Sequence, residues 1–487
     1  MHAKRQGRAF WHWYAKDDTP EERKLIVKLD LLIVPYAVLA YWIKYIDHSN
    51  LNNAYVSGLK EDLNFQSNQS VNLNAMYTAG AVIGQLPFTI LFPMFPMNYT
   101  IPALEAGWGI FTLLKYRAQG YAELMTYCFF AAFFPGVHFV LGACYRGDEL
   151  GHLGGVFYVG QMLGTLTAGL IQSGASSNLD GVRGLAGWRW MFIISALMTI
   201  PIAIAGVVLW PETPAKPNML ILTDQDLALA IKRLKETKAD TTEEIKQGKW
   251  KLVLNIATDW KIYILTFWAI LFWNSGSTSS GAYLLWLKSL GRFSTPEVNQ
   301  LGTTAPALGI FYVLFVNFSS DLLWGPSGAI AFAHSWNFTA MTILAVWKVP
   351  ESAKWIALNS AYIQVAMSSV LYGWANDMLR YNATERSIAI VFMNLIAQST
   401  TAWTSVLVFP TVEAPRFLKG FTFCAANSVV MVLFTYLVVR PYSKALERKY
   451  ESDAESEVSA PEFEESGSGK SVERDSKSGT TAIEATV

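Results

Sequence analysis

Long apolar stretches alternate with short polar ones along most of the chain. Because about 20 apolar residues cross a bilayer as a helix, windows bounded by charged or turn residues predict twelve transmembrane helices. The first six lie at approximately residues 30–48, 71–92, 99–115, 122–144, 153–174 and 188–210. The other six lie at approximately residues 262–286, 300–319, 325–347, 354–373, 387–409 and 418–440. The pattern therefore predicts an all-α polytopic membrane protein.

The composition supports insertion into a membrane. Of the 487 residues, 52% are hydrophobic and only 16% are charged, whereas a soluble domain carries about 25% charged residues. Between residues 262 and 347 the only charged side chains are Lys288, Arg292, Glu297 and Asp321. Water cannot solvate so apolar a stretch, which excludes a soluble protein.

The polar segments divide the chain into five parts. They are a cytoplasmic N-terminal segment, a six-helix half, a cytoplasmic central loop, a second six-helix half and a tail, at residues 1–29, 30–210, 211–261, 262–440 and 441–487. Seven Lys and Arg residues precede residue 29 and seven more lie between residues 232 and 251, whereas the loop after the first span holds only Lys60. Because Lys and Arg stay on the cytoplasmic side, both termini and the central loop are predicted to be cytoplasmic.

Two polar segments carry further predictions. Residues 224–238 place apolar side chains at helical spacing, at Leu227, Ala228, Ile231 and Leu234. This spacing indicates an amphipathic helix, either along the membrane surface or packed as a linker on the bundle. After Arg440 the chain is acidic and rich in Ser and Gly, a composition that buries too little apolar surface to fold. The tail is therefore predicted to be disordered and cytoplasmic.

Several function classes find no support in the residues. The three cysteines, Cys128, Cys144 and Cys424, lie in apolar runs without disulfide or metal-ligand spacing. The balance of 38 basic and 38 acidic side chains argues against a nucleic-acid partner. Gly154, Gly155 and Gly160 lack the Lys-Ser/Thr that completes a phosphate-binding loop. We therefore expect neither an enzyme nor a cofactor.

A few charged residues lie inside the predicted spans. A charge at bilayer depth costs at least ~2.5–3.5 kcal/mol, so it needs a partner or a water-filled cavity. The candidates for substrate binding or proton coupling are Lys44, Asp47, His48, Glu105, His138, Arg189 and Lys354. Lys44, Asp47 and His48 are three or four residues apart on one helix, so one interpretation is a self-neutralising cluster. The other makes Lys44 an anion contact and Asp47 a proton carrier.

The remaining candidates also have two interpretations each. His138 can couple protons to a carboxylate, because imidazole titrates near neutral pH, or it can be a neutral residue bonded to a backbone carbonyl. Glu105 can pair with a cation on a neighbouring span or carry a proton. Trp273 and Asn274 of the seventh span, together with Tyr36 and Tyr41 of the first, can line a cavity or mediate helix packing.

Five strings in order along the chain carry a family resemblance, at residues 47–63, 134–150, 179–194, 371–386 and 411–421. They include Asp47-His48-Ser49-Asn50, Gly187-Trp188-Arg189-Trp190 and Glu413-Ala414-Pro415-Arg416. Residues 20–445 resemble the anion:cation symporter (allantoate permease) family of fungal major facilitators, above all its pantothenate-transporter-like branch. This resemblance implies two six-helix halves and a monomer in the plasma membrane. It also implies uptake of a small organic anion, such as pantothenate or a related vitamin carboxylate, with protons.

The chain departs from the family pattern after the second span, where residues 95–99 read Phe-Pro-Met-Asn-Tyr instead of a motif with Gly, Asp and Arg. This departure leaves room for a changed substrate or altered coupling. Two other functions therefore stay open: export of a secondary metabolite by proton antiport, and a nutrient sensor that does not transport.

Five Asn-x-Ser/Thr sequons begin at Asn68, Asn98, Asn317, Asn337 and Asn382. Under the predicted topology only Asn68 lies outside the cell. Asn68 is therefore the glycosylation candidate.

Overall fold

The computed structural model describes residues 19–91, 95–134, 147–209, 212–213, 216–217, 223, 225–226, 228–229, 258–379, 383–446 and 448. Two compact units divide the chain, Met1–Pro441 and Tyr442–Val487, and the helices discussed below belong to the first. In the described part the only strands are β1 (Glu212–Thr213) and β2 (Lys216–Pro217), an antiparallel pair. The prediction of an all-α protein is thus confirmed for the bundle.

The first part of the bundle, which we call the N-terminal helices, runs from Pro20 to Leu209. Its elements are α1 (Pro20–Ala54), η1 (Tyr55–Leu59), α2 (Lys60–Asp62), α3 (Gln69–Leu91), α4 (Met97–Leu114), η2 (Lys115–Arg117), α5 (Tyr121–Phe133), α7 (Gly147–Asn178), η3 (Val182–Gly184) and α8 (Gly187–Leu209). Helix α1 begins ten residues before the predicted span, because Thr19 and Glu22 form a capping box and Pro20 occupies the first turn.

The second part, the C-terminal helices, runs from Trp260 to Val439. Its elements are α11 (Trp260–Trp273), η6 (Thr278–Ser280), α12 (Ala282–Ser289), α13 (Thr295–Gly302), α14 (Thr304–Ser319), η7 (Ser320–Trp324), α15 (Gly325–Val346), α16 (Glu351–Asn359), α17 (Tyr362–Val365), α18 (Ser368–Met378), α19 (Ala383–Val408), η8 (Thr411–Glu413), α20 (Leu418–Phe434) and η9 (Thr435–Val439).

Two predicted spans, 262–286 and 354–373, are interrupted rather than continuous. The first breaks after Trp273 and restarts after Gly281, whose φ of 66° is a left-handed conformation that glycine adopts readily. A break inside a membrane frees backbone groups, which neighbouring helices must satisfy. Gln364 meets this need, because its Nε2 donates to the carbonyl oxygen of Phe272 at 2.6 Å.

Four helical stretches among the described residues are long and apolar enough to cross a membrane: Gly187–Val207, Thr295–Val346, Ile388–Val408 and Leu418–Leu446. The second of these covers two of the predicted spans. Helix α11 is apolar but shorter, at 14 residues. The total of twelve transmembrane helices stays a prediction.

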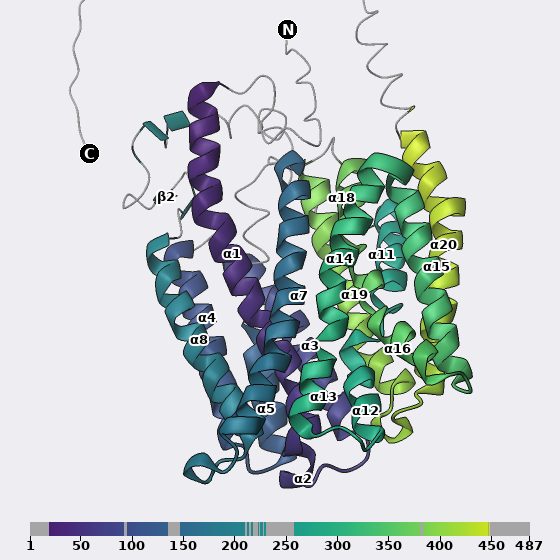
Figure 1. Cartoon of the computed structure of the whole chain (residues 1–487). Coiled ribbons are helices and arrows are strands. Elements are labelled where there is room, and N and C mark those ends of the chain that lie inside the picture. Colours follow the sequence, from purple (N-terminus) through teal and green to yellow (C-terminus); the bar gives the residue numbers. More distant parts are fainter. Residues whose placement is uncertain are drawn as a thin grey trace, which may run out of the picture. The chain divides into compact units, whose positions relative to one another are not determined.

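Successive long helices run in opposite directions, so their connections gather at two ends of the bundle (Figure 1). We call one of these the loop end; it holds the connections at residues 55–68, 115–120, 179–186, 289–303, 347–350 and 409–417. The start of α1 and the end of α20 lie at the opposite end (Figure 1). This alternation agrees with a polytopic topology.

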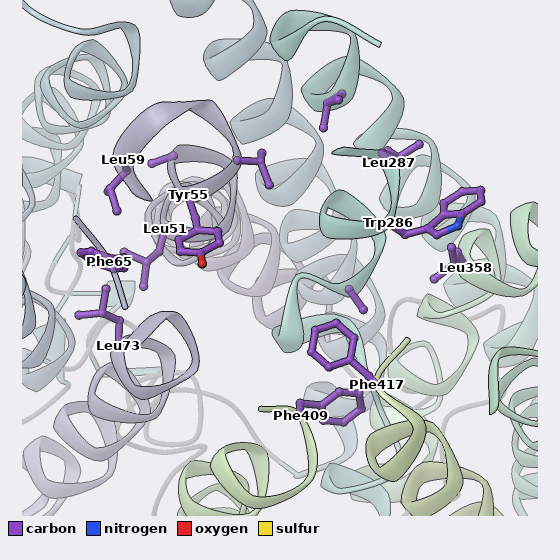
Figure 2. Packing of buried hydrophobic residues seen from close by; sticks show 14 of the residues in the cluster. Leu51, Tyr55, Leu59, Phe65, Leu73, Trp286, Leu287, Leu358, Phe409 and Phe417 are labelled. Carbon is purple, nitrogen blue, oxygen red and sulfur yellow. The ribbon is translucent and has the colours of Figure 1, made fainter. Parts of the chain in front are cut away.

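A cluster of buried apolar side chains joins the N-terminal and C-terminal helices at the loop end. Figure 2 shows Tyr55 and Leu73 of the N-terminal helices together with Trp286, Phe409 and Phe417 of the C-terminal part. Removal of these large side chains from water favours the contact at this end of the bundle.

The described residues of the central loop begin a helix where the sequence predicts one. Thr223 caps it, since its Oγ1 accepts from the backbone nitrogen of Asp226 at 3.3 Å. The Asp226 carboxylate also lies 2.6 Å from Nζ of Lys28 in α1, and this hydrogen bond holds the pKa of Asp226 below its ordinary value. The rest of the predicted amphipathic helix falls largely outside the described residues. The predicted disordered tail begins too early, because residues 441–446 are helical; most of its remainder lies outside the described residues.

Candidate functional site

A buried ion pair links α1 to the end of α4. Nζ of Lys115 lies 3.1 Å from both carboxylate oxygens of Asp47, and Nε1 of Trp108 donates to Asp47 Oδ2 at 2.8 Å. Lys115 and Asp47 are 2% and 3% exposed. The interpretation that Lys44 neutralises Asp47 within one helix is therefore wrong, because the partner comes from another helix. Sequence reasoning missed Lys115, which resembles an ordinary charge flanking a span.

Lys44 is left as a half-buried cation inside the N-terminal helices. Within the described part of the chain it makes no hydrogen bond or ion pair. Two tyrosines of α1 lie within one turn of it: the hydroxyl of Tyr41 donates to Oε1 of Gln161 at 3.3 Å, and the rings of Tyr41 and Tyr45 are 4.7 Å apart. Its neighbourhood on α1 is thus polar and aromatic, a setting in which an anion can bind the ammonium group.

His48 lies one turn from Lys44 on α1 and is also half-buried. Its ring centroid is 5.8 Å from that of Tyr45 and 5.0 Å from that of Tyr77 in α3. His48 therefore joins α1 to α3 through aromatic contacts. The other histidine candidate, His138, lies outside the described residues.

Glu105 of α4 is 2% exposed and accepts a hydrogen bond of 2.5 Å from the hydroxyl of Tyr36 in α1. Its second oxygen, Oε1, is buried and has no hydrogen-bond partner. The cation that the sequence led us to expect beside Glu105 is not found among the described residues; a tyrosine takes that place.

Arg189 and Lys354 hold local structure near the loop end. Nη1 of Arg189 donates to the carbonyl oxygens of Tyr116 and Ala118 at 2.6 and 3.1 Å, which satisfies backbone groups where η2 ends. Nζ of Lys354 lies 4.4 Å from the ring centroid of Trp347, a cation–π distance. Both of these cations thus have a partner among the described residues, unlike Lys44.

Asn274 stabilises the break in the seventh span. Its Nδ2 donates to the carbonyl oxygen of Ile270 at 2.9 Å and to Oγ1 of Thr400 at 2.8 Å, and its Oδ1 accepts from Thr404 at 2.5 Å. Both hydrogens and the oxygen of the amide are thus engaged, as expected for a buried polar group at a broken helix.

Trp273 begins a line of hydrogen bonds that crosses the bundle. Its Nε1 donates to the Tyr372 hydroxyl at 2.9 Å, which donates to Oδ1 of Asn394 at 3.2 Å. Nε2 of Gln398 donates to the same Asn394 oxygen at 3.3 Å, and Nε2 of Gln85 in α3 donates to Oε1 of Gln398 at 3.4 Å. We call these five residues the polar chain. Asn394 and Gln398 were missed because single amides in an apolar helix carry no distinct signal.

Further polar contacts connect the two sets of helices at the loop end. Nδ2 of Asn299 donates to Oγ of Ser57 at 2.8 Å, and Lys288 forms an exposed ion pair of 3.2 Å with Glu61. Oδ1 of Asn68 accepts from the backbone nitrogen of Val412 at 3.2 Å. Asn68 therefore takes part in this contact, and its glycosylation stays a prediction.

No cofactor site emerges from the side chains that the structure describes. Among them no group of three or more His, Cys, Asp or Glu residues could hold a metal ion. The described site consists of one cation, one ion pair, one buried carboxyl group and a line of uncharged polar residues.

Two curated relatives are similar over most of the chain. The vitamin H transporter of Saccharomyces cerevisiae is 37% identical over 439 residues, which cover 88% of this chain and 74% of the relative. The pantothenate transporter liz1 of Schizosaccharomyces pombe is 33% identical over 412 residues, covering 82% and 78%. The predicted resemblance to fungal pantothenate transporters is confirmed, and so is the expectation that the protein is not an enzyme.

A solved structure of the proton:xylose symporter XylE shares the fold, with a TM-score of 0.66, 15% identity and coverage of 86% of this chain and 96% of that one. The family model of the Major Facilitator Superfamily matches residues 37–432, a range that includes both Lys44 and the polar chain. This multi-pass membrane protein therefore belongs to the Major Facilitator Superfamily, and it is a transporter.

Proposed function

We propose that this protein takes up a small organic anion together with protons across the fungal plasma membrane, and that the substrate is a vitamin carboxylate such as biotin or pantothenate. The observation that carries the proposal is Lys44, an interior ammonium group without an ion-pair partner in the described part of the chain. The names of the two relatives, which are transporters of vitamin H and of pantothenate, support the choice of substrate. The five strings in the sequence support the anion:cation symporter (allantoate permease) family as the subfamily.

A carboxylate is the ligand that suits Lys44. An unpaired cation is costly to keep within a membrane protein, so a bound anion removes a penalty as well as adding an attraction. Asp47 cannot fill this role, because Lys115 and Trp108 already engage its carboxylate. For proton coupling, His138 and Asp47 remain the candidates, with His48 and Glu105 beside them.

The uptake test uses fungal cells that lack their own vitamin transport. We expect accumulation of labelled biotin or pantothenate, but not of allantoate, and we expect a protonophore to abolish it. Lys44→Gln should raise the KM about 10- to 100-fold, since a hydrogen bond to a charged group contributes about 1.5–3 kcal/mol. Lys44→Arg should keep part of the uptake because it keeps the charge.

Lys354→Gln is the matched control, because the Lys354 ammonium contacts the Trp347 ring instead of facing the interior unpaired. An unchanged KM in Lys44→Gln would refute the role of Lys44. Lowered retention of a labelled compound would favour export, and binding without flux in either direction would favour a sensor.

Orientation is a second part of the proposal: both termini and the central loop lie in the cytoplasm, and the loop end faces outside. The Lys and Arg residues near the start of α1 and in the central loop support it. The Lys28–Asp226 contact agrees, because it joins these two segments at one end. With this orientation the two sets of helices meet at the outer side.

Accessibility labelling tests the orientation. A tag inserted at residue 240 should react with antibody only after cells are permeabilised, whereas an engineered sequon near Ser294, in the loop end, should become glycosylated. Labelling of the tag in intact cells would reverse the topology and remove Asn68 as a glycosylation candidate.

A further inference from the structure

The polar chain has no role in the uptake mechanism described so far. We propose that it forms the second half of the substrate site and binds the uncharged amide, ureide or hydroxyl end of the organic acid whose carboxylate contacts Lys44. This inference rests on the proposed function. It assigns the transporter a ligand held in one orientation, with its charge at the N-terminal helices and its neutral end at the C-terminal helices.

Unused donors of the polar chain support a ligand there. Within the described residues Asn394 accepts two hydrogen bonds at Oδ1 and its Nδ2 donates none. Gln398 donates from Nε2 to a single acceptor. Both amides are half-buried, where unpaired N–H groups are costly. Carbonyl or hydroxyl oxygens of a ligand would satisfy them.

The chemistry of the polar chain selects a neutral group. Its members are a tryptophan, a tyrosine, an asparagine and two glutamines, all half-buried and uncharged. A carboxylate placed among them would find hydrogen bonds but no cation, and burying an unpaired charge is far more costly than burying an amide. The charged end of the ligand is therefore better placed at Lys44.

Lys44 and the polar chain lie at similar depths in the bundle. Helices α1 and α3 run in opposite directions and touch where His48 meets Tyr77. Lys44 lies four residues from His48 along α1, and Gln85 lies eight residues from Tyr77 along α3. Both steps lead away from the loop end. At about 1.5 Å per residue the two differ by only about 6 Å along the helix axes, so a ligand between them would lie across the bundle.

The link between Gln85 and Gln398 is also easy to replace. Its length of 3.4 Å is beyond the usual range for an N–H···O hydrogen bond, so it is weak. A ligand oxygen can take the place of one amide there at little cost. Sites that hydrogen-bond a substrate discriminate strongly against analogues that lack the bonding group, so the polar chain should set specificity.

Competition assays test this division of the site. The first probe is labelled biotin, and its competitor is pentanoate, which keeps the carboxylate and lacks the ureide. The second probe is labelled pantothenate, and its competitor is propanoate, which keeps the carboxylate and lacks the amide and hydroxyl groups. In the unmodified transporter the truncated acid should inhibit at least about tenfold more weakly than the vitamin. Asn394→Leu should raise the KM for the vitamin about tenfold and leave inhibition by the truncated acid unchanged. Lys44→Gln should raise the KM for the vitamin and also weaken inhibition by the truncated acid.

Gln398→Met, which is close to glutamine in size, is the second variant and should repeat the effect of Asn394→Leu. Ser405→Ala is the control on α19, because the Ser405 hydroxyl donates only to the Thr401 carbonyl oxygen. Equal weakening of the vitamin and the truncated acid in Asn394→Leu would overturn the inference alone. Equally strong inhibition by the vitamin and the truncated acid in the unmodified transporter would also overturn the inference alone, and this measurement needs no variant. If the unmodified transporter takes up neither vitamin, the proposed function fails and this inference with it.

Discussion

Lys115→Met is expected to destabilise the transporter severely, because it leaves the Asp47 carboxylate buried without its cation. Removing one partner of a buried ion pair costs about 3–5 kcal/mol, and both groups here are almost fully buried. The Trp108 hydrogen bond to Asp47 Oδ2 cannot neutralise the remaining charge. The measurement is the melting temperature and monodisperse yield of detergent-purified protein.

The double variant Asp47→Asn with Lys115→Met is the informative comparison. It removes both charges, and neutral replacements of a buried pair are often close to neutral in stability, so its melting temperature should return toward that of the unmodified protein. Lys60→Met is the control, since Lys60 is exposed on α2. A single Lys115→Met variant as stable as the control would contradict the assignment.

The same variants separate stability from transport. Asp47→Asn alone is expected to lower uptake at all pH values, since it leaves Lys115 buried and unpaired. If the double variant regains stability but not uptake, the ion pair also takes part in the transport cycle. If it regains both, the pair is structural and proton coupling must lie elsewhere, with His138 the next candidate.

Gly84→Ala is expected to prevent correct folding, because α3 and α5 approach each other at backbone contact. A Cβ at Gly84 would overlap the carbonyl oxygen of Phe133, and one at Gly80 would overlap that of Phe129. Glycines four residues apart are a common device for such close helix packing in membranes. We expect a loss of at least about 3 kcal/mol, the upper part of the range for overpacking, measured as the yield of monodisperse protein.

Gly174→Ala is the matched control in α7. A Cβ at Gly174 would meet nothing within 4 Å, so the substitution should leave the yield unchanged or raise it slightly, as alanine favours the helix. Normal yield and melting temperature in Gly84→Ala would show that α5 can move away from α3.

The sequence alone determined the fold class and most helix positions, because hydropathy and end signals are local. The predicted span at 71–92 matches α3 at Gln69–Leu91, and the span at 188–210 matches α8 at Gly187–Leu209. The excess of Lys and Arg in two segments was likewise enough to predict an orientation. Each of these signals depends on a window of about 20 residues or fewer.

Only the tertiary structure decided which charges are paired. Asp47 and Lys115 are 68 positions apart, and the sequence offered Lys44 as a nearer partner on the same helix. Helical spacing ranks neighbours on one helix but says nothing of which face meets another helix. For this reason the absence of an ion-pair partner for Lys44 among the described residues emerged only when the contacts of α1 with α4 were known.

The polar chain and the interrupted spans were decided in the same way. Continuous hydropathy predicted one helix over residues 262–286, yet the break after Trp273 is stable because Gln364 and Thr400 from other helices satisfy the groups around it. The roles of Asn394 and Gln398 can be seen only from their hydrogen bonds with Tyr372 and Gln85. The role of a polar residue in a membrane depends on its hydrogen-bond and ion-pair partners, and those come from segments far apart in the chain.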